Sequence, residues 1–414
     1  MNSTEAYFGL PSDVFFCTKC NMSNQRPISA DEYKHKDNSD KETVLFDSDR
    51  VCSACRYKER ERNEIDWNQR EQELEELCAR YRSKDGSYDC LVPGSGGKDS
   101  VYQSWVLKYK YGMNPLTVTW SPHLYTDVGW RNFQSWIHNG GFDNFLFTPN
   151  GKVHRLLTRL ATINLLHPFQ PFIMGQKTFA VKMAAKFNIK LIFYGEAPAE
   201  YGMPVSDDTS MFDDTECDGF RIDYGDVKVE DLFFGGVSGG QLIKDYEVNP
   251  TDLYAYLPIN GSVMRQKNIQ YHYLGYYMKW DPQECYYFSV DKINFEANPV
   301  RTEGTYSKYN SLDDKTDGFF YYTYWIKFGI GRAMQDSAQE VRNGKITSEE
   351  GRLLIEKFDG EFPKRYQDEF LEYVGLSIGE FQDLCDKFRS PHLWIKHAGE
   401  WKLRHTPSLT GYND

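Results

Sequence analysis

The sequence lacks long apolar segments and has no excess of basic residues. No apolar run approaches the roughly 20 residues that a membrane-spanning helix needs, so no membrane partner is predicted. Residues 1–13 carry neither the basic nor the apolar part of a signal peptide, which predicts a cytoplasmic protein. The 60 acidic residues outnumber the 48 lysines and arginines, for a formal net charge of −12. This balance argues against nucleic acid as a partner.

The chain also lacks any arrangement of Cys and His that would indicate a glutaminase of its own. Its nine cysteines, in a reducing compartment, favour metal binding or free thiols over disulfides. Five of them are scattered: Cys78, Cys90, Cys217, Cys285 and Cys385. The 414 residues are enough for a sizeable core in two or three structural units. The 29 tyrosines suit hydrogen-bonding pockets such as sugar sites, although a tyrosine-rich core explains them nearly as well.

The other four cysteines form two C-x-x-C pairs. Cys17 and Cys20 make the first pair, and Cys52 and Cys55 make the second. Two such turns close the tetrahedral four-sulfur site that Zn²⁺ prefers. The polar stretch 21–51 could not bury a core by itself, so a metal would supply folding energy. The sequence favours structural zinc over a redox pair or an iron–sulfur cluster, and four thiolates leave no open position for catalysis.

The most informative motif is the run Pro93-Gly94-Ser95-Gly96-Gly97-Lys98-Asp99-Ser100. It follows an apolar strand predicted at 88–92 and opens a helix predicted at 99–110. Small residues at such a turn let backbone N–H groups surround a phosphate, and the helix N-terminus adds its positive dipole end. A Walker A loop is excluded because Val92 and Asp99 stand where that motif needs Gly and Ser or Thr. A Rossmann G-x-G-x-x-G would need Gly at position 99.

The remaining pattern, S-G-G-x-D-S, resembles the PP-loop of the ATP pyrophosphatases. Those enzymes cleave ATP between its α- and β-phosphates and release AMP and pyrophosphate. An ordinary glycine turn is the alternative interpretation of the run.

Downstream of this loop, strands and helices alternate. The pattern predicts strands at 116–120, 145–148 and 190–194, and helices at 128–137, 153–165 and 175–187. Such alternation indicates a parallel sheet with helices on both faces, whose ligands bind at the carboxyl ends of the strands. We therefore predict an α/β fold built on a doubly wound parallel sheet.

A second run at a strand end makes the resemblance more specific: Gly195-Glu196-Ala197-Pro198-Ala199-Glu200-Tyr201-Gly202. Together with Gly175-Gln176-Lys177, it resembles the N-acetyl sugar amidotransferase family of the PP-loop superfamily. The resemblance extends to the four-cysteine module, the 95–100 loop and the tail around 344–347, and so covers most of the chain. Ala197 is a departure, because an amide side chain often follows the Gly-Glu in this family.

The resemblance implies a PP-loop domain of the adenine nucleotide α-hydrolase-like type and a particular activity. Enzymes of this family convert the acetamido group of a sugar nucleotide to acetamidino during surface-polysaccharide (LPS O-antigen) or nonulosonate biosynthesis. ATP, Mg²⁺ and Zn²⁺ are the implied cofactors, and a sugar nucleotide is the implied substrate. Because the chain has no glutaminase signature, ammonia would come from a separate glutaminase with a barrel partner, similar to the imidazole glycerol phosphate synthase pair.

Four side chains are the candidate catalytic residues in this scheme. Asp99 is expected to bind Mg²⁺, although a helix cap would use the same residue. Glu196 would complete the magnesium site or accept a proton from ammonium, and Glu200 is a weaker candidate. Lys98 would neutralise phosphate charge or point to solvent. The predicted nucleotide-binding residues are Ser95, Gly96, Gly97, Lys98, Asp99, Ser100, Gly175, Gln176, Lys177 and Gly195.

Three further features of the sequence have a structural interpretation as well as a functional one. Gln176 and Lys177 are expected to begin a helix near the same edge, and His123 follows the second strand, where adenine or substrate would pass. A lone loop histidine is more often structural. The acidic stretch at about 201–250 is expected to be a solvated insertion, with a lid or a docking surface as the sharper alternative. The run Gly235 to Gly240 is expected to be a flexible hinge or turn.

The predicted organisation has four parts. Segments 271–278 and 286–290 are strands or buried aromatic segments, and Thr347 to Glu350 form a capping box that opens a helix. The helical region would pack on the nucleotide domain, contribute to the sugar site or form a homodimer surface. The predicted boundaries are a zinc module at 1–62, a linker helix at 63–84, a PP-loop domain at 85–300 and a mainly helical region at 301–414.

Two other functions fit parts of this pattern. A PP-loop tRNA-modifying thiolase would combine cysteine pairs with adenylation of a base, but the acidic balance weighs against it. A zinc-stabilised scaffold that binds nucleotide without turnover is the non-enzymatic alternative, and the intact Ser95, Asp99 and Ser100 argue against it.

Overall fold

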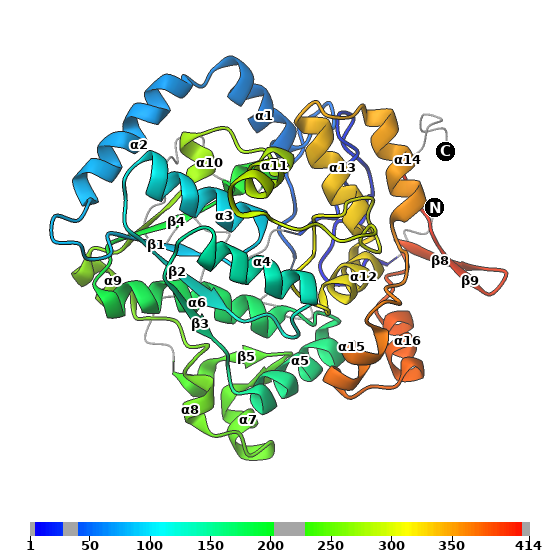
Figure 1. Cartoon of the computed structure of the whole chain (residues 1–414). Helices are drawn as coiled ribbons and strands as arrows, with labels where there is room; N and C mark the ends of the chain where they lie inside the picture. Colours follow the sequence, from blue (N-terminus) through cyan, green and yellow to red (C-terminus); the bar gives the residue numbers. More distant parts are fainter. Residues whose placement is uncertain (1–4, 28–39, 203–227, 408–414) are drawn as a thin grey trace.

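The computed structural model describes residues 5–27, 40–202 and 228–407 (Figure 1). Its centre is a five-stranded parallel sheet in the order β3-β2-β1-β4-β7. Leu91 of β1 lies beside Leu116 of β2 and Ile192 of β4. The strands are β1 (Cys90–Pro93), β2 (Pro115–Trp120), β3 (Asn144–Phe147), β4 (Leu191–Tyr194) and β7 (Gln270–Tyr273). This confirms the predicted α/β fold and its four predicted strands.

Helices cover both faces of the sheet, and β1 shows the division residue by residue. Leu91 packs in the core shared with α5 (Gly151–Leu165) and α6 (Gln170–Phe187). Cys90 and Val92 point the other way and pack with α2, η1 and α11, as the two-residue period of a strand requires. The elements of this second layer are α2 (Trp67–Tyr81), α3 (Lys98–Trp105), η1 (Val106–Lys110), α4 (Asp127–His138) and α11 (Pro282–Ile293).

Two predicted elements differ from the structure. Helix α6 begins at Gln170 rather than near Gly175, so Gln176 and Lys177 lie within the helix and do not begin it. Residues 286–290 lie inside helix α11, where the Asp281 side chain accepts hydrogen bonds from two amides of the first turn. This cap favours a helix despite the aromatic, strand-like composition of the segment. Segment 271–278 is strand β7 followed by the short helix α10 (Leu274–Tyr277).

The acidic stretch is not a solvated insertion over its whole length. Residues 203–227 lie outside the described part of the chain. Beyond them, Val229, Leu232 and Phe234 are buried in the core that α5 and α6 share. The run predicted as a hinge or a turn forms the turn of the β5–β6 hairpin and then the start of a capped helix. The elements here are η3 (Val229–Asp231), β5 (Phe233–Phe234), β6 (Val237–Ser238), α7 (Gly239–Asp245), α8 (Pro250–Leu253) and α9 (Gly261–Lys267).

The carboxy-terminal region is mainly helical, as predicted. The Thr347 capping box is present, with Thr347 and Glu350 each accepting from the other's backbone amide. A small hairpin, β8 (Trp394–His397) with β9 (Glu400–Leu403), closes the region and was not predicted. The helices are α12 (Asp317–Phe328), α13 (Arg332–Arg342), α14 (Ser348–Phe358), α15 (Gln367–Val374) and α16 (Ile378–Lys387).

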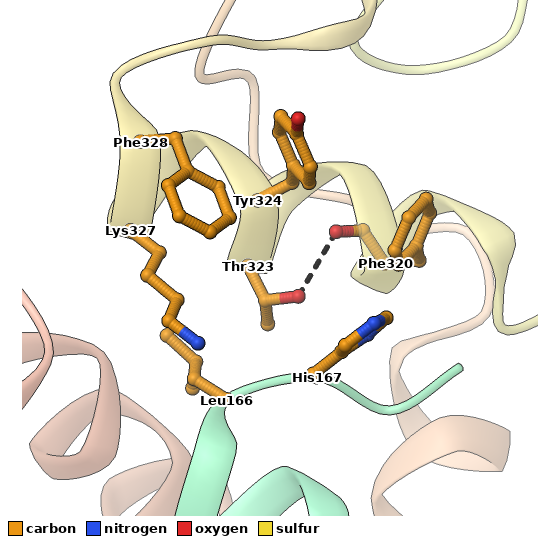
Figure 2. Close-up of a pocket in the computed structure, with 7 residues that line it drawn as sticks. All are labelled: Leu166, His167, Phe320, Thr323, Tyr324, Lys327 and Phe328. Carbon is orange, nitrogen blue, oxygen red and sulfur yellow. Dashed lines mark hydrogen bonds between the residues drawn. The ribbon is translucent and has the colours of Figure 1, made fainter. Parts of the chain in front are cut away.

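Figure 2 shows where this region meets α5. Lys327 of α12 donates a hydrogen bond to the carbonyl of Leu165. The rings of His167 and Phe320 stack on each other. The cavity between them has a volume of about 10 Å³, which is room for about one water molecule. It is therefore a packing gap and not a substrate site.

The amino-terminal cysteine module packs on the carboxy-terminal helices α13 and α14, so segments far apart in the sequence lie side by side (Figure 1). Met22 and the four paired cysteines share one core with Met334, Ile355 and Trp394. The Asn21 amide also donates to the carbonyl of Ser348. Helix α1 (Ser53–Asn63) leads from the second cysteine pair toward α2. Across the described ranges, no helix combines the length and apolar character that crossing a membrane requires.

Candidate functional site

The four paired cysteines converge on one point. The Sγ atoms of Cys17 and Cys55 are 3.8 Å apart, those of Cys20 and Cys52 are 3.6 Å apart, and all four lie within 4.8 Å of one another. Zn–S bonds of about 2.3 Å in a tetrahedron place the sulfurs about 3.8 Å apart. The four buried thiols therefore fit a single tetrahedral ion, whereas a four-iron cluster would attach each sulfur to a different iron.

The glycine-rich loop joins β1 to α3 at the carboxyl edge of the sheet. Gly96 has a φ of +83°, and a Cβ there would lie 2.6 Å from the Cα of Phe133. Gly97 is the N-cap of α3 and has no side-chain cap, and the Ser100 hydroxyl donates to its carbonyl. The loop therefore combines a left-handed backbone with uncapped amides at a helix N-terminus, which is an anion-binding geometry.

We expect Gly96→Ala to destabilise the protein and to weaken binding of a phosphate-bearing ligand at the loop. The added methyl group would be forced against the backbone of α4, at a φ that costs a non-glycine residue about 1–2 kcal/mol. Gly86→Ala is the matched control, because Gly86 has a φ of +85° but nothing within 4 Å of its Cβ position. Thermal unfolding and ATP titration would show both losses in the first variant. Equal effects in the two variants would contradict the close packing of the loop.

Lys98 and Asp99 form an ion pair at the start of α3. Burial lowers the pKa of Lys98, but the charges of Asp99 and Glu196 outweigh it and hold the pKa above its usual value. Burial and the nearby Asp99 carboxylate raise the pKa of Glu196. The second oxygen of Asp99, Oδ1, is buried and has no hydrogen-bond partner among the described residues. The carboxylates of Asp99 and Glu196, with the unpartnered Oδ1 of Asp99, suit a divalent cation such as Mg²⁺.

Glu196 follows β4 and is held by the short helix η2 (Pro198–Tyr201). The Tyr201 hydroxyl donates to Glu196 Oε1 at 2.9 Å. The cysteine module reaches this segment: the Ser53 hydroxyl donates to the carbonyl of Gly202, and the Arg26 guanidinium lies 5.5 Å from the centre of the Tyr201 ring. The module is thus packed against the segment that carries Glu196.

Glu200 lies on the same short helix, η2, and is 5% exposed. Its Oε1 atom has no hydrogen-bond partner among the described residues. Burial raises the pKa of Glu200 well above its usual value, and the nearby Glu61 carboxylate adds to the shift. This shift favours the neutral form of the Glu200 carboxyl.

We expect Glu200→Gln to stabilise the protein at alkaline pH. Because burial raises the folded-state pKa, the stability that Glu200 contributes is fully present below its unfolded pKa of about 4.5 and is lost as the pH rises through the folded value. Gln remains neutral, so its melting temperature should exceed that of the wild type increasingly above pH 4.5 and match it below. Glu75→Gln on exposed α2 is the control. A constant difference at all pH values would contradict this expectation.

The remaining predicted nucleotide-binding residues lie apart from the loop cavity. A Cβ at Gly175 would lie 2.2 Å from the Trp120 ring, and one at Gly195 would lie 2.9 Å from the Trp280 ring. Both positions therefore need glycine for packing against an indole. Gln176 is exposed and Lys177 is buried within α6. None of these four residues lines the cavity at the glycine-rich loop.

That cavity has a volume of about 180 Å³ and is closed by residues from the carboxy-terminal region. Asp313 lines the cavity together with Ser95, and burial raises the pKa of Asp313, which the nearby Ser95 side chain partly opposes. Arg332 also lines the cavity and pairs with Asp336 at 2.9 Å. Neither residue is predicted from the sequence, because both lie far from the loop along the chain and belong to no motif. The lining of the cavity includes Ser95, Gly96, Gly97, Lys98, Asp99, Asn132, Ser311, Asp313 and Arg332.

His123 has a structural partner. Its Nδ1 atom lies 2.8 Å from Asp314 Oδ2, and the same carboxylate oxygen accepts the backbone N–H of His123. The ring also stacks on Phe172. These contacts tie the end of β2 to the start of the helical region, as the structural interpretation of this histidine expects.

Fold and site together define an α/β protein with an anion-binding glycine loop at the carboxyl edge of a parallel sheet and a four-cysteine cluster suited to a metal. Within the chain, residues 303–406 match the C-terminal domain of WbpG-like LPS biosynthesis proteins. Asp313 and Arg332 lie in the matched region, so a domain of this kind contributes to the loop cavity.

Two other comparisons are more limited. The uncharacterized protein MJ1599 of Methanocaldococcus jannaschii is 44% identical over 46 residues, which is 11% of this chain and 17% of that protein. The U34-tRNA thiolase NcsA from Methanococcus maripaludis, solved with its [4Fe-4S] cluster, is 11% identical, and the alignment covers 83% of this chain and 89% of that one. Its TM-score of 0.28 is too low for any conclusion about this protein.

Proposed function

We propose that this protein is an ATP-dependent amidotransferase that converts an acetamido group of a sugar nucleotide to acetamidino in LPS biosynthesis. The observation that carries the proposal is the loop cavity, where the glycine-rich loop meets a region that matches an LPS biosynthesis domain. The S-G-G-x-D-S pattern of the loop supports ATP as the co-substrate. The adjoining cations Lys98 and Arg332 suit its phosphates.

The chemistry requires activation of an unreactive amide. The amide oxygen attacks the α-phosphorus of ATP, the bond to the bridging oxygen breaks, and pyrophosphate leaves. Ammonia then adds to the imidate carbon, a proton is lost, and the carbon–oxygen bond breaks to release AMP and the amidine. Most of the catalysis is positioning together with stabilisation of charge at phosphorus.

The residues at the loop would divide this work. Backbone amides from Ser95 to Ser100 would hold the departing pyrophosphate, with Lys98 neutralising its charge. Asp99 and Glu196 would hold Mg²⁺, which supplies charge neutralisation at the phosphates. Since the pKa of Glu196 is raised, it could also accept the proton from ammonium. The cysteine cluster would hold a structural Zn²⁺.

A partner must supply the ammonia under this proposal. No glutaminase motif is present in the sequence, so a separate glutaminase with a barrel-shaped partner would deliver it. Free ammonium should replace this partner in the test tube at high concentration.

A nucleotide-product assay with Mg-ATP, ammonium and a panel of diacetamido sugar nucleotides tests the proposal. We expect AMP and pyrophosphate in equal amounts with one sugar nucleotide, together with an amidine product. ADP as the product, or AMP formed only with tRNA and a sulfur donor, would overturn it in favour of a different ATP enzyme or the thiolase.

A further inference from the structure

A second and larger cavity lies at the carboxyl ends of β2 and β3. Its volume is about 720 Å³, within the range of about 300–1,000 Å³ that is usual for small-molecule sites. Ser121 to Leu124 follow β2 and Thr148 to Gly151 follow β3, and both segments line it. Tyr373 of α15 forms part of its wall. The cavity is thus at the edge of the sheet where ligands of open α/β proteins bind.

The charges around this cavity have one sign, although the chain as a whole is acidic. Lys152 and Arg155 line it, and no Asp or Glu is among its lining residues. Neither cation forms an ion pair with a described carboxylate, and Arg155 lies 5.0 Å from the centre of the Tyr373 ring. Both cations are exposed and stand in the first turns of α5. This arrangement attracts an anion.

Two histidines in the wall of the cavity each have a ring nitrogen without a hydrogen-bond partner among the described residues. His154 is 3% exposed, its Nδ1 lies 2.6 Å from the Tyr256 hydroxyl, and its Nε2 is buried without a partner. His123 Nε2 is likewise buried and unpartnered among the described residues. Burial lowers the pKa of His154 far below its usual value, so the ring is neutral. In either tautomer, the Nε2 atom of His154 has no partner among the described residues and can form a hydrogen bond with a ligand.

We propose that this cavity binds the diphosphate of a sugar nucleotide, with Lys152 and Arg155 as its contacts at the N-terminus of α5. The inference rests on the proposed function and adds to it a location for the sugar nucleotide. The loop cavity, at about 180 Å³, is too small to hold ATP and a sugar nucleotide together. The two cavities at the carboxyl edge of the sheet would hold the two substrates separately, ATP at the loop and the sugar nucleotide in the larger cavity.

The two cavities share a wall. Segment 123–126 pairs with segment 312–316: Thr126 N–H donates to the carbonyl of Asp313, and Lys315 N–H donates to that of Leu124. Ser311, Leu312 and Asp313 line the loop cavity, while His123 and Leu124 line the larger one. A sugar nucleotide held by its diphosphate in the larger cavity would therefore place its sugar beside the wall that borders the ATP phosphates.

Titration calorimetry with UDP-N-acetylglucosamine, UDP, inorganic pyrophosphate and Mg-ATP tests the assignment. The test variant is Lys152→Gln with Arg155→Gln, which should fold normally because both side chains are exposed. The control is Lys186→Gln, an exposed lysine in the last turn of α6, at the opposite edge of the sheet. We expect the double variant to bind UDP-N-acetylglucosamine and UDP at least tenfold more weakly, with Mg-ATP binding and the control unchanged.

Three results would overturn the assignment. One is equal affinity of the double variant and the wild type for UDP-N-acetylglucosamine. Another is a loss of Mg-ATP binding in the double variant, which would give the cavity to ATP. The third is binding of pyrophosphate but of neither uridine nucleotide to the wild type at millimolar concentration. Since binding is measured without ammonia or turnover, a failure of the amidotransferase assay leaves these results unaffected, and the two proposals fail separately.

Discussion

Asp99→Asn should reduce AMP formation by about 10²- to 10³-fold, the usual cost of losing one electrostatic contact at the reacting centre. Asn keeps the size of the side chain but removes the charge that pairs with Lys98 and the carboxylate offered to Mg²⁺. The Oδ1 atom of Asp99, which has no hydrogen-bond partner among the described residues, should be the oxygen that binds Mg²⁺. Steady-state assays at several Mg²⁺ concentrations would measure the loss, and the Mg²⁺ dependence should shift to higher concentration.

Asp127→Asn is the matched control for this variant. Asp127 is an exposed aspartate in the first turn of α4, at the same edge of the sheet, but it does not line the loop cavity. Both substitutions remove a carboxylate that favours the positive end of a helix dipole. If Asp127→Asn reduces AMP formation as much as Asp99→Asn, then Asp99 acts only on its helix and its assignment to Mg²⁺ is wrong.

Much of the fold could be predicted because its signals are local. The four predicted strands are short apolar runs that follow turns. In the helices between them, apolar residues recur at the spacing of one helical face. The start of α6 was placed five residues late because the glycine at 175 suggests a boundary, whereas its actual role is to leave room for Trp120. Residues 286–290 have the composition of a strand, and only the Asp281 cap and the packing of α11 on α3 decide for a helix.

Some residues of the candidate site could likewise be predicted from the sequence, and others could not. The glycine-rich loop and the cysteine pairs are visible because each has its residues at fixed spacing. Asp313 and Arg332 could not be found, because it is the fold that brings the carboxy-terminal region to the loop. Nor could the sequence show that Glu200 is buried with an unpartnered oxygen, while Glu196 is held by Tyr201.

Cys52→Ser should abolish metal binding by the cluster and lower the melting temperature by about 5 °C or more, at roughly 1 °C for each kcal/mol lost in a chain of 414 residues. Cys52 is both a member of the cluster and the N-cap of α1. Cys52 shares a core with Met334 and Trp394, so loss of the metal should loosen both the amino-terminal module and the carboxy-terminal helices that pack on it. Metal analysis of the wild type should give one zinc ion per chain, and iron with sulfide would contradict the zinc assignment.

The same variant tests whether the module supports the reacting groups. Because Ser53 and Arg26 contact the segment that carries Tyr201, and Tyr201 donates to Glu196, a loosened module should release Glu196 from its place beside Asp99. We therefore expect the rate of AMP formation to fall even at temperatures where the variant remains folded. Cys78→Ser is the control, since Cys78 is equally buried but lies outside the cluster. If both variants lose stability and keep full activity below their melting temperatures, the module is a fold element that does not position Glu196.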